Sequence, residues 1–333
     1  MRIAIDAMGG DQAPGAILAG ALEGLALLDA ADELILVGQE EVIRATLGAE
    51  LAKHANVKIL HASEVITMND HPVEAVRGKR DSSIVKMVKL AREGGADAII
   101  SAGNTGALVA SGVLMLKSLK GVERPGIAVT LPAIGGKAVM MCDAGANTQS
   151  KASHLYQYAV MCSLYMKALR GVDNARVGIL NVGTEEEKGT PLVKEARELI
   201  MADESLNFVG YVEGRDIHKS VCDVLVTDGF TGNITLKVIE GWSEGLFGNL
   251  KAQIKAESPE LIEILKPVMG RVMKLYDHEE YGGAMLLGVA GIFFKVHGSA
   301  SGRAIKNVIG AAKAAGKLDV NKMIEERLGA AEQ

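Results

Sequence analysis

Two stretches of the sequence carry the same arrangement of residue types. Residues 97–108 read DAIISAGNTGAL, and residues 223–236 read DVLVTDGFTGNITL. Each has an Asp, three apolar residues, a Ser or Thr, a glycine and then a Thr-Gly pair. Glycine permits close approach of the backbone to a ligand, and the first N–H groups of a helix bind anions. The repeat therefore predicts two strand-to-helix loops that cradle phosphate.

An ordinary strand-to-helix turn would use the same residue types, because Thr and Asn also cap helices. Two matching copies favour a shared binding role over this purely structural one. The phosphate-binding candidates are Ser101, Asn104, Thr105 and Gly106 in the first loop, and Asp228, Thr231, Gly232 and Asn233 in the second.

Three more apolar runs end in polar, glycine-rich segments. These segments read DAMGGD at residues 6–11, DAGAN at 143–147 and NVGTEEEKG at 181–189. Ligands of open α/β sheets bind beyond the carboxyl ends of the strands, so several such exits predict one composite site. The further binding candidates are Asp6, Gly9, Gly10, Asn147 and Thr184.

The candidate catalytic residues are Lys188, Asn181 and His297. A loop lysine is most often a solvated surface charge, but the Asn, Thr and Gly residues around Lys188 favour contact with phosphate or an oxyanion. Asn181 ends the preceding apolar run. His297 also follows an apolar run and is suited to proton transfer, although a lone histidine in this setting is more often structural.

Motifs of several other reaction classes are absent from the sequence. There is no G-x-x-x-x-G-K-[ST] phosphate loop, no G-x-G-x-x-G fingerprint, no H-E-x-x-H and no clustered Cys/His spacing. GWSEG at 241–245 fits a G-x-S-x-G nucleophile elbow, but a helical pattern rather than a strand precedes Ser243. We expect no metal and no cofactor. In group transfer the acceptor would then attack directly, and the enzyme would act by positioning and electrostatics.

The composition is that of a globular protein, with 48% hydrophobic and 23% charged residues in a chain of 333. The net charge of −5 argues against nucleic-acid binding, which needs a basic field. The three cysteines form no C-x-x-C pair, which favours buried small residues in a reducing cytosol. We find no signal peptide, and the apolar segment 282–294 is shorter than the ~20 residues of a membrane span. These features predict a cytoplasmic protein.

Short apolar runs that alternate with helical patterns predict βαβ units and a mostly parallel sheet covered on both faces. We therefore expect one α/β domain over residues 1–333, folded as a three-layer α/β/α sandwich. The predicted strands are 3–5, 34–37, 57–60, 98–100, 127–129, 139–141, 177–180, 208–212 and 224–226.

Residues 241–281 are expected to leave the sheet as a helical excursion. Apolar residues recur there every three to four positions, which gives each helix an apolar face. A membrane surface or a second subunit would cover these faces, and both fit if a dimer leaves only the tip near Pro259 exposed. The two stripes are Trp242, Leu246, Phe247 and Leu250, and Leu261, Ile262, Leu265, Val268, Met269 and Val272.

These motifs, in this order, resemble the PlsX-type phosphate acyltransferases of bacterial phospholipid synthesis. The resemblance spans nearly the whole chain and includes RP at 124–125, YGG at 281–283 and HGS at 297–299. It implies a fold similar to the isocitrate and isopropylmalate dehydrogenases, used as a homodimer without a cofactor. It also implies transfer of an acyl group from acyl-[acyl carrier protein] to inorganic phosphate. The acyl phosphate would feed a membrane glycerol-3-phosphate acyltransferase.

An acidic carrier protein would need a basic docking patch. Arg77, Lys79 and Arg80 offer one, with a solvated helix entrance as the alternative. Three other functions stay open at this point. The chain could be a phosphate acetyltransferase-like enzyme that uses acyl-CoA, or a decarboxylating dehydrogenase, although neither metal carboxylates nor a nicotinamide site is found. It could also be a non-catalytic sensor of acyl carrier protein or lipid.

Overall fold

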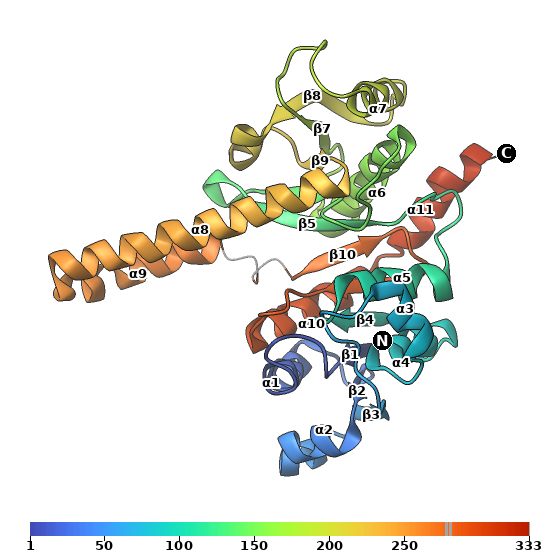
Figure 1. The fold of residues 1–333 in the computed structure, drawn as a ribbon, viewed down its shortest axis with the longest axis vertical. Coiled ribbons are helices and arrows are strands. Elements are labelled where there is room, and N and C mark those ends of the chain that lie inside the picture. Colours follow the sequence, from blue (N-terminus) through green and yellow to red (C-terminus); the bar gives the residue numbers. More distant parts are fainter. Residues whose placement is uncertain (277–278, 280–281, 333) are drawn as a thin grey trace.

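The computed structural model describes residues 1–276, 279 and 282–332, which form one eleven-stranded sheet between layers of helices (Figure 1). The strand order is β3-β2-β1-β4-β11-β10-β5-β6-β9-β7-β8. The strands are β1 (Arg2–Asp6), β2 (Glu33–Gly38), β3 (Val57–His61), β4 (Ala98–Ser101), β5 (Gly126–Pro132), β6 (Ala138–Cys142), β7 (Arg176–Asn181), β8 (Asn207–Glu213), β9 (Val224–Val226), β10 (Ala284–Leu287) and β11 (Ile292–Lys295).

All nine predicted runs lie in strands, which confirms the sequence reading of β1 to β9. The strands β10 and β11 were not predicted. They form from the apolar segment 282–294, which the sequence analysis considered only as a membrane span of insufficient length. Gly288 has a φ of 89°, and it separates the two strands by a turn that favours glycine.

The sheet contains two parallel blocks joined by antiparallel pairing. One block is β3-β2-β1-β4-β11, and the other is β6-β9-β7-β8. Between them, β11–β10, β10–β5 and β5–β6 are antiparallel. Three successive reversals mean that the two blocks run in opposite directions. The sheet is therefore mostly parallel, as predicted, with its exceptions at the centre.

Helices cover both faces of the sheet, so the predicted three-layer sandwich is confirmed. Each face has its own hydrophobic core, and Cys142, Cys162 and Cys222 are all free and buried, as expected. The first core is covered by α1 (Gly15–Gly24), α2 (Glu40–Leu47), α6 (Ala152–Arg170), α7 (Pro191–Met201), α10 (Gly302–Lys317) and α11 (Val320–Leu328), and the second by α3 (Pro72–Gly78), α4 (Ser83–Arg92), α5 (Thr105–Leu116) and part of α8.

A helical hairpin projects from the sandwich, as the sequence predicts (Figure 1). It consists of α8 (Gly229–Glu257) and α9 (Pro259–Tyr276), so it begins well before the predicted boundary at residue 241. The rings of Phe247 and Tyr276 lie 6.1 Å apart between the two helices. Ser243 lies inside α8, which confirms that no strand precedes it.

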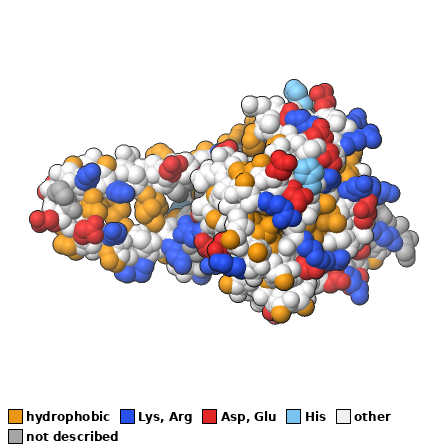
Figure 2. All heavy atoms as spheres, turned by 90° about the horizontal axis from the view of Figure 1, so that it is seen from below, with side chains coloured by type: hydrophobic (Ala, Val, Ile, Leu, Met, Phe, Trp, Pro, Cys, Tyr) orange, Lys and Arg blue, Asp and Glu red, His pale blue; other side chains and the backbone are white. Residues whose placement is uncertain are grey.

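Part of the hairpin's apolar surface stays uncovered, and Figure 2 shows hydrophobic side chains along it. Trp242 is 77% exposed and Ile264 is 69% exposed. Among the residues that the structure describes, no helix is both long and apolar enough to cross a membrane. A single sheet runs through both blocks, and we therefore propose that residues 1–333 form one domain.

Candidate functional site

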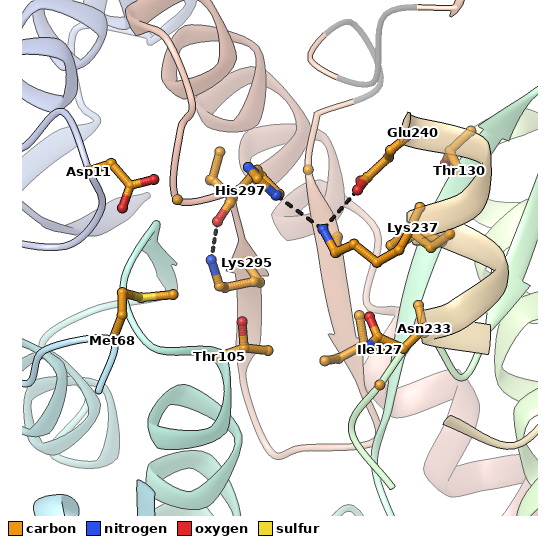
Figure 3. A pocket seen from close by; sticks show the side chains of 18 residues that line it. Asp11, Met68, Thr105, Ile127, Thr130, Asn233, Lys237, Glu240, Lys295 and His297 are labelled. Carbon is orange, nitrogen blue, oxygen red and sulfur yellow. Dashed lines mark hydrogen bonds and ion pairs between the residues drawn. The ribbon is translucent and has the colours of Figure 1, made fainter. Parts of the chain in front are cut away.

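A cavity of about 420 Å³ lies between the parallel blocks (Figure 3). Its volume is within the range of small-molecule sites, roughly 300–1,000 Å³. Side chains from the first block, from the central strands and from α8 converge on it. The lining residues are Asp11, Met68, Thr105, Ile127, Val129, Thr130, Ala144, Gly145, Asn233, Leu236, Lys237, Glu240, Gly283, Ala284, Lys295, Val296, His297 and Gly298.

Lys295 ends β11 and reaches into this cavity (Figure 3). Its Nζ donates to the carbonyl oxygen of Ala102 at 3.2 Å and to that of Val296. Burial lowers the pKa of Lys295 to about 8, and the nearby carboxylate of Asp6 partly opposes this shift. The side chain therefore carries a positive charge at neutral pH and loses it within the pH range of ordinary assays.

A second lysine reaches the cavity from the opposite side, on α8. Lys237 Nζ lies 3.1 Å from His297 Nε2 and 2.8 Å from Glu240 Oε2. The ring nitrogen Nε2 faces the Lys237 ammonium group, and Nδ1 accepts from the backbone amide of Ser299 at 3.3 Å. That nitrogen lies 2.8 Å from Ser299 Oγ. His297 is thus held in one orientation by both halves of the site.

The first predicted loop forms the strand-to-helix turn between β4 and α5. Asn104 caps α5, and its side-chain oxygen accepts from the amide of Ala107 at 3.0 Å. Its Nδ2 donates to the carbonyl oxygens of Thr67 and Asp70 at 3.1 and 3.2 Å. The Asn104 amide therefore holds the loop together, whereas Thr105 at the helix start lines the cavity.

The second predicted loop joins β9 to α8. Asp228 caps α8, and its Oδ1 accepts from the amides of Phe230 and Thr231 at 3.0 and 2.9 Å. The Thr231 hydroxyl donates to Asp228 Oδ2 at 2.7 Å. One turn further along α8, Asn233 lines the cavity. The loop thus supplies Asn233 to the site, while Asp228 and Thr231 form the cap.

The glycines of these two loops have a packing role that the sequence analysis did not predict. Neither Gly106 nor Gly232 has a positive φ. A Cβ on Gly106 would lie 2.5 Å from Cγ of Pro72, and one on Gly232 would lie 1.9 Å from the carbonyl oxygen of Asp143. Neighbouring protein atoms therefore already fill the space beside these two glycines.

Asp6 ends β1 and is buried beside the site. It accepts from Ser101 Oγ at 2.7 Å, and burial raises its pKa above the ordinary value. Neither side chain lines the cavity. Ser101 pairs with Lys295 in the sheet, and the charge of Asp6 raises the pKa of this lysine against the effect of burial.

The glycines after β1 permit close contact between two loops. A Cβ on Gly9 would lie 2.3 Å from Asp6 Oδ2, and Gly10 has a φ of 105°, which favours glycine. The next amide, that of Asp11, donates to the carbonyl oxygen of Gly298 at 2.7 Å. These contacts bring the DAMGGD and HGS motifs together at one edge of the cavity.

The DAGAN loop is organised by a buried carboxylate. Asp143 accepts from the backbone amides of residues 127, 145, 146 and 147 at 2.7–3.0 Å, although burial raises its pKa. Asn147 donates from Nδ2 to the carbonyl oxygen of Pro125 at 2.6 Å and to Tyr158 Oη at 2.9 Å. Asn147 therefore shapes the loop, and its neighbour Gly145 lines the cavity.

The loop that follows β7 lies outside the residues that line this cavity. Asn181 donates from Nδ2 to the carbonyl oxygen of Gly183 at 3.1 Å. Thr184 and Lys188 are exposed. The structure therefore brings together Thr105, Asn233 and His297 but not these three residues, whose roles stay predictions.

The predicted docking residues lie in and after α3, which packs against α5. Arg77 and Arg80 are exposed. Lys79 instead donates to Asp70 Oδ2 at 2.6 Å and to the carbonyl oxygen of Val65 at 2.9 Å. Two of the three residues thus present their charge to solvent, and the third joins an internal ion pair.

Sequence reasoning missed Lys295 and Lys237. Lys237 lies four residues after Asn233 on the same face of α8, so helical spacing could have indicated it. No comparable signal existed for Lys295, because its strand was not predicted. In the part of the chain that the structure describes, no group of three or more His, Cys, Asp or Glu could hold a metal ion.

The fold is similar to that of solved structures of an acyl-group transferase and of a protein named as a dehydrogenase. A branched-chain phosphotransacylase from Enterococcus faecalis superposes with a TM-score of 0.60 at 15% identity, covering 94% of this chain and 99% of the other. A Salmonella typhimurium structure, provisionally named a 4-hydroxythreonine-4-phosphate dehydrogenase, gives 0.51 at 13% identity with the same coverage. At these identities, the likeness shows the α/β fold alone.

Sequence comparison is more specific. Residues 1–323 match the family described as "Fatty acid synthesis protein". The phosphate acyltransferase of Oceanobacillus iheyensis is 45% identical over 315 residues, which covers 94% of this chain and 93% of the relative. The chain belongs to this family of phosphate acyltransferases, and the resemblance found in its motifs is confirmed.

Proposed function

We propose that this protein transfers a fatty acyl group from acyl-[acyl carrier protein] to inorganic phosphate and releases acyl phosphate for phospholipid synthesis. The observation that carries the proposal is the cavity in which Lys295, Lys237 and His297 converge on largely apolar walls. Cationic side chains suit phosphate and a developing oxyanion, whereas apolar walls suit an acyl group.

The proposed reaction needs no nucleophile from the protein. A phosphate oxygen attacks the thioester carbonyl carbon, the C–S bond breaks, and the carrier thiol leaves with a proton. Lys295 and Lys237 would neutralise charge on phosphate and on the carbonyl oxygen. His297 would accept the proton of the attacking hydrogen phosphate and pass it to the leaving sulfur. The N–H groups at the start of α5, beside Thr105, would add further donors to phosphate.

The proposal is tested by incubating the protein with palmitoyl-[acyl carrier protein] and phosphate and trapping acyl phosphate with hydroxylamine. Palmitoyl-CoA and acetyl-CoA are offered in parallel reactions. Acyl phosphate formed mainly from the carrier-protein donor supports the proposal. Preference for a CoA donor would instead favour the phosphate acetyltransferase-like alternative. Binding of the donor without turnover would identify a sensor of acyl carrier protein or lipid.

We further propose that the carrier protein docks beside α3. Arg77 and Arg80 are exposed there. The segment before this helix contributes Met68 to the cavity wall, so a donor bound at this position would deliver its acyl group nearby. Replacing both arginines with Glu should raise the KM for the carrier-protein donor and leave that for a CoA donor unchanged.

We also propose a homodimer built through the hairpin, with peripheral attachment to the cytoplasmic face of a membrane. Phe247 and Tyr276 face each other between the helices, but Trp242, Leu246 and Val268 remain 77%, 57% and 48% exposed. A second copy would bury most of this surface, and the tip near Pro259 would meet lipid. Product release there would supply a membrane glycerol-3-phosphate acyltransferase. No nucleic-acid partner is proposed.

A further inference from the structure

We propose that the distal part of a long acyl chain passes between β5 and β10 into a second cavity on the opposite face of the sheet. This inference rests on the proposed function, because only a long-chain donor extends far beyond its reacting carbonyl. It adds a binding subsite for a saturated or monounsaturated hydrocarbon chain and a structural cause for chain-length preference.

The passage lies where two central strands stop pairing. The β5–β10 ladder runs from Gly126–Leu287 to Ala128–Met285, and no further pair joins these strands among the described residues. Gly283 precedes β10 with a φ of 76°, which lies outside the extended region of a strand. Thr130 lies two residues beyond the last paired residue of β5. Both Thr130 and Gly283 line the first cavity and also the second.

Alternation along β5 shows that the two cavities lie on different faces. Successive side chains of a strand point to opposite sides of a sheet. Ile127 and Val129 line the first cavity and Ala128 lines the second, whereas Thr130, at the passage, lines both. The core memberships agree, because Ile127 and Val129 belong to one hydrophobic core and Ala128 to the other. A chain that joins the cavities therefore has to cross the sheet.

The second cavity suits a hydrocarbon chain. Its volume is about 140 Å³, and most of its lining side chains are apolar. A third cavity of about 290 Å³ shares Thr130, Met140 and Arg170 with it, so the path continues toward the exposed end of α6. The second cavity is lined by Ala128, Thr130, Met140, Tyr165, Leu169, Arg170, Gly283, Met285, Ala311 and Ala314.

The two cavities share lining residues, and this arrangement favours an acyl chain as the ligand of the second cavity. The first cavity holds the lysines and the histidine, so a carbonyl group that reacts there has its chain directed along the apolar wall. Each buried methylene strengthens binding by about fourfold. Ala128, Met140 and Met285 offer no hydrogen bond to water or phosphate, whereas Thr130 and Arg170 add polar groups to the lining. The acyl chain is the component of the proposed substrates that gains from this path.

The inference is tested by substitutions on α10 that place larger side chains in the second cavity. Ala311→Leu adds volume at a half-buried position, and Ala314→Phe adds it at an exposed one, where the cost to folding is small. Ala45→Met, on the exposed face of α2, serves as a matched control remote from the site. Turnover is measured with octanoyl and palmitoyl carrier-protein donors under subsaturating conditions.

We expect both cavity variants to lower palmitoyl turnover by about tenfold or more, the effect of losing roughly two buried methylenes. Octanoyl turnover should change by less than about twofold, and the control should match the unaltered protein. Equal loss with both donors, or no loss in either folded variant, would overturn the inference and leave the proposed function intact. Absence of acyl phosphate with either donor in the unaltered protein would overturn both.

Discussion

Replacement of Lys295 by Met tests the central electrostatic feature of the site. Met has a similar length and no charge, so the substitution removes the ammonium group while the side chain still fills the end of β11. Removal of one preorganised oxyanion donor typically costs about 100- to 1,000-fold in kcat, or about 2.7–4 kcal/mol. We expect a loss of this size in acyl phosphate formation. Thermal unfolding serves as the control for folding.

The pH dependence gives a second and sharper readout. Burial lowers the pKa of Lys295 to about 8, so its charge is lost as the pH rises through that value. About half of the molecules carry the charge at pH 8 and about one tenth at pH 9, so turnover should fall about fivefold between them. Lys295→Arg keeps its charge over this range and should remove that decline. Ionisation of phosphate affects both proteins equally.

The reasoning about Lys295 is refuted by either of two results. Near-normal turnover in a folded Lys295→Met variant would reduce the residue to a structural role. A decline at alkaline pH that persists unchanged in an active Lys295→Arg variant would assign the titration to another group.

Three further predictions concern residues singled out in the sequence. Lys188→Ala should slow turnover by about 100-fold or more without affecting folding, and near-normal turnover would identify Lys188 as a surface charge. Gly106→Val and Gly232→Val should lower the melting temperature rather than only raise the KM for phosphate, since a Cβ would meet Pro72 or the Asp143 carbonyl. Leu261→Glu with Ile262→Glu should abolish co-sedimentation with anionic vesicles while the dimer and solution turnover persist. Loss of the dimer would instead assign both residues to a subunit interface.

Much of the fold could be predicted because apolar runs bounded by polar exits identify buried parallel strands. The strands β10 and β11 could not be predicted in this way. In the segment 282–294, β10 and β11 are buried on both faces and show no alternation, so the sequence resembles a single apolar run. Their place beside β4 and β5 depends on long-range pairing that periodicity does not encode.

Of the predicted site residues, Thr105, Asn233 and His297 line the cavity, and the others do not. Polar residues at strand exits do surround the cavity, but Asn104 and Asn147 use their amides to hold the loop backbone. Residue type alone does not distinguish an amide that binds a ligand from one that binds a carbonyl. The sequence did not indicate a functional role for Lys295, because a lysine after an apolar run resembles the solvated end of a strand. Only the neighbouring strands of the folded sheet bury this side chain.

The central position of β10 and β11 has a consequence for how the protein is made. These strands complete the sheet, but they follow β1 to β9 in the order of synthesis. Until they arrive, β4 and β5 each lack one neighbour and expose an unpaired edge of apolar sequence, which is a template for aggregation. At about 5–20 residues per second, β1 to β9 are synthesised several seconds before β10 and β11. The complete sheet therefore forms only after β10 and β11 are synthesised, and the nascent chain needs protection over that interval.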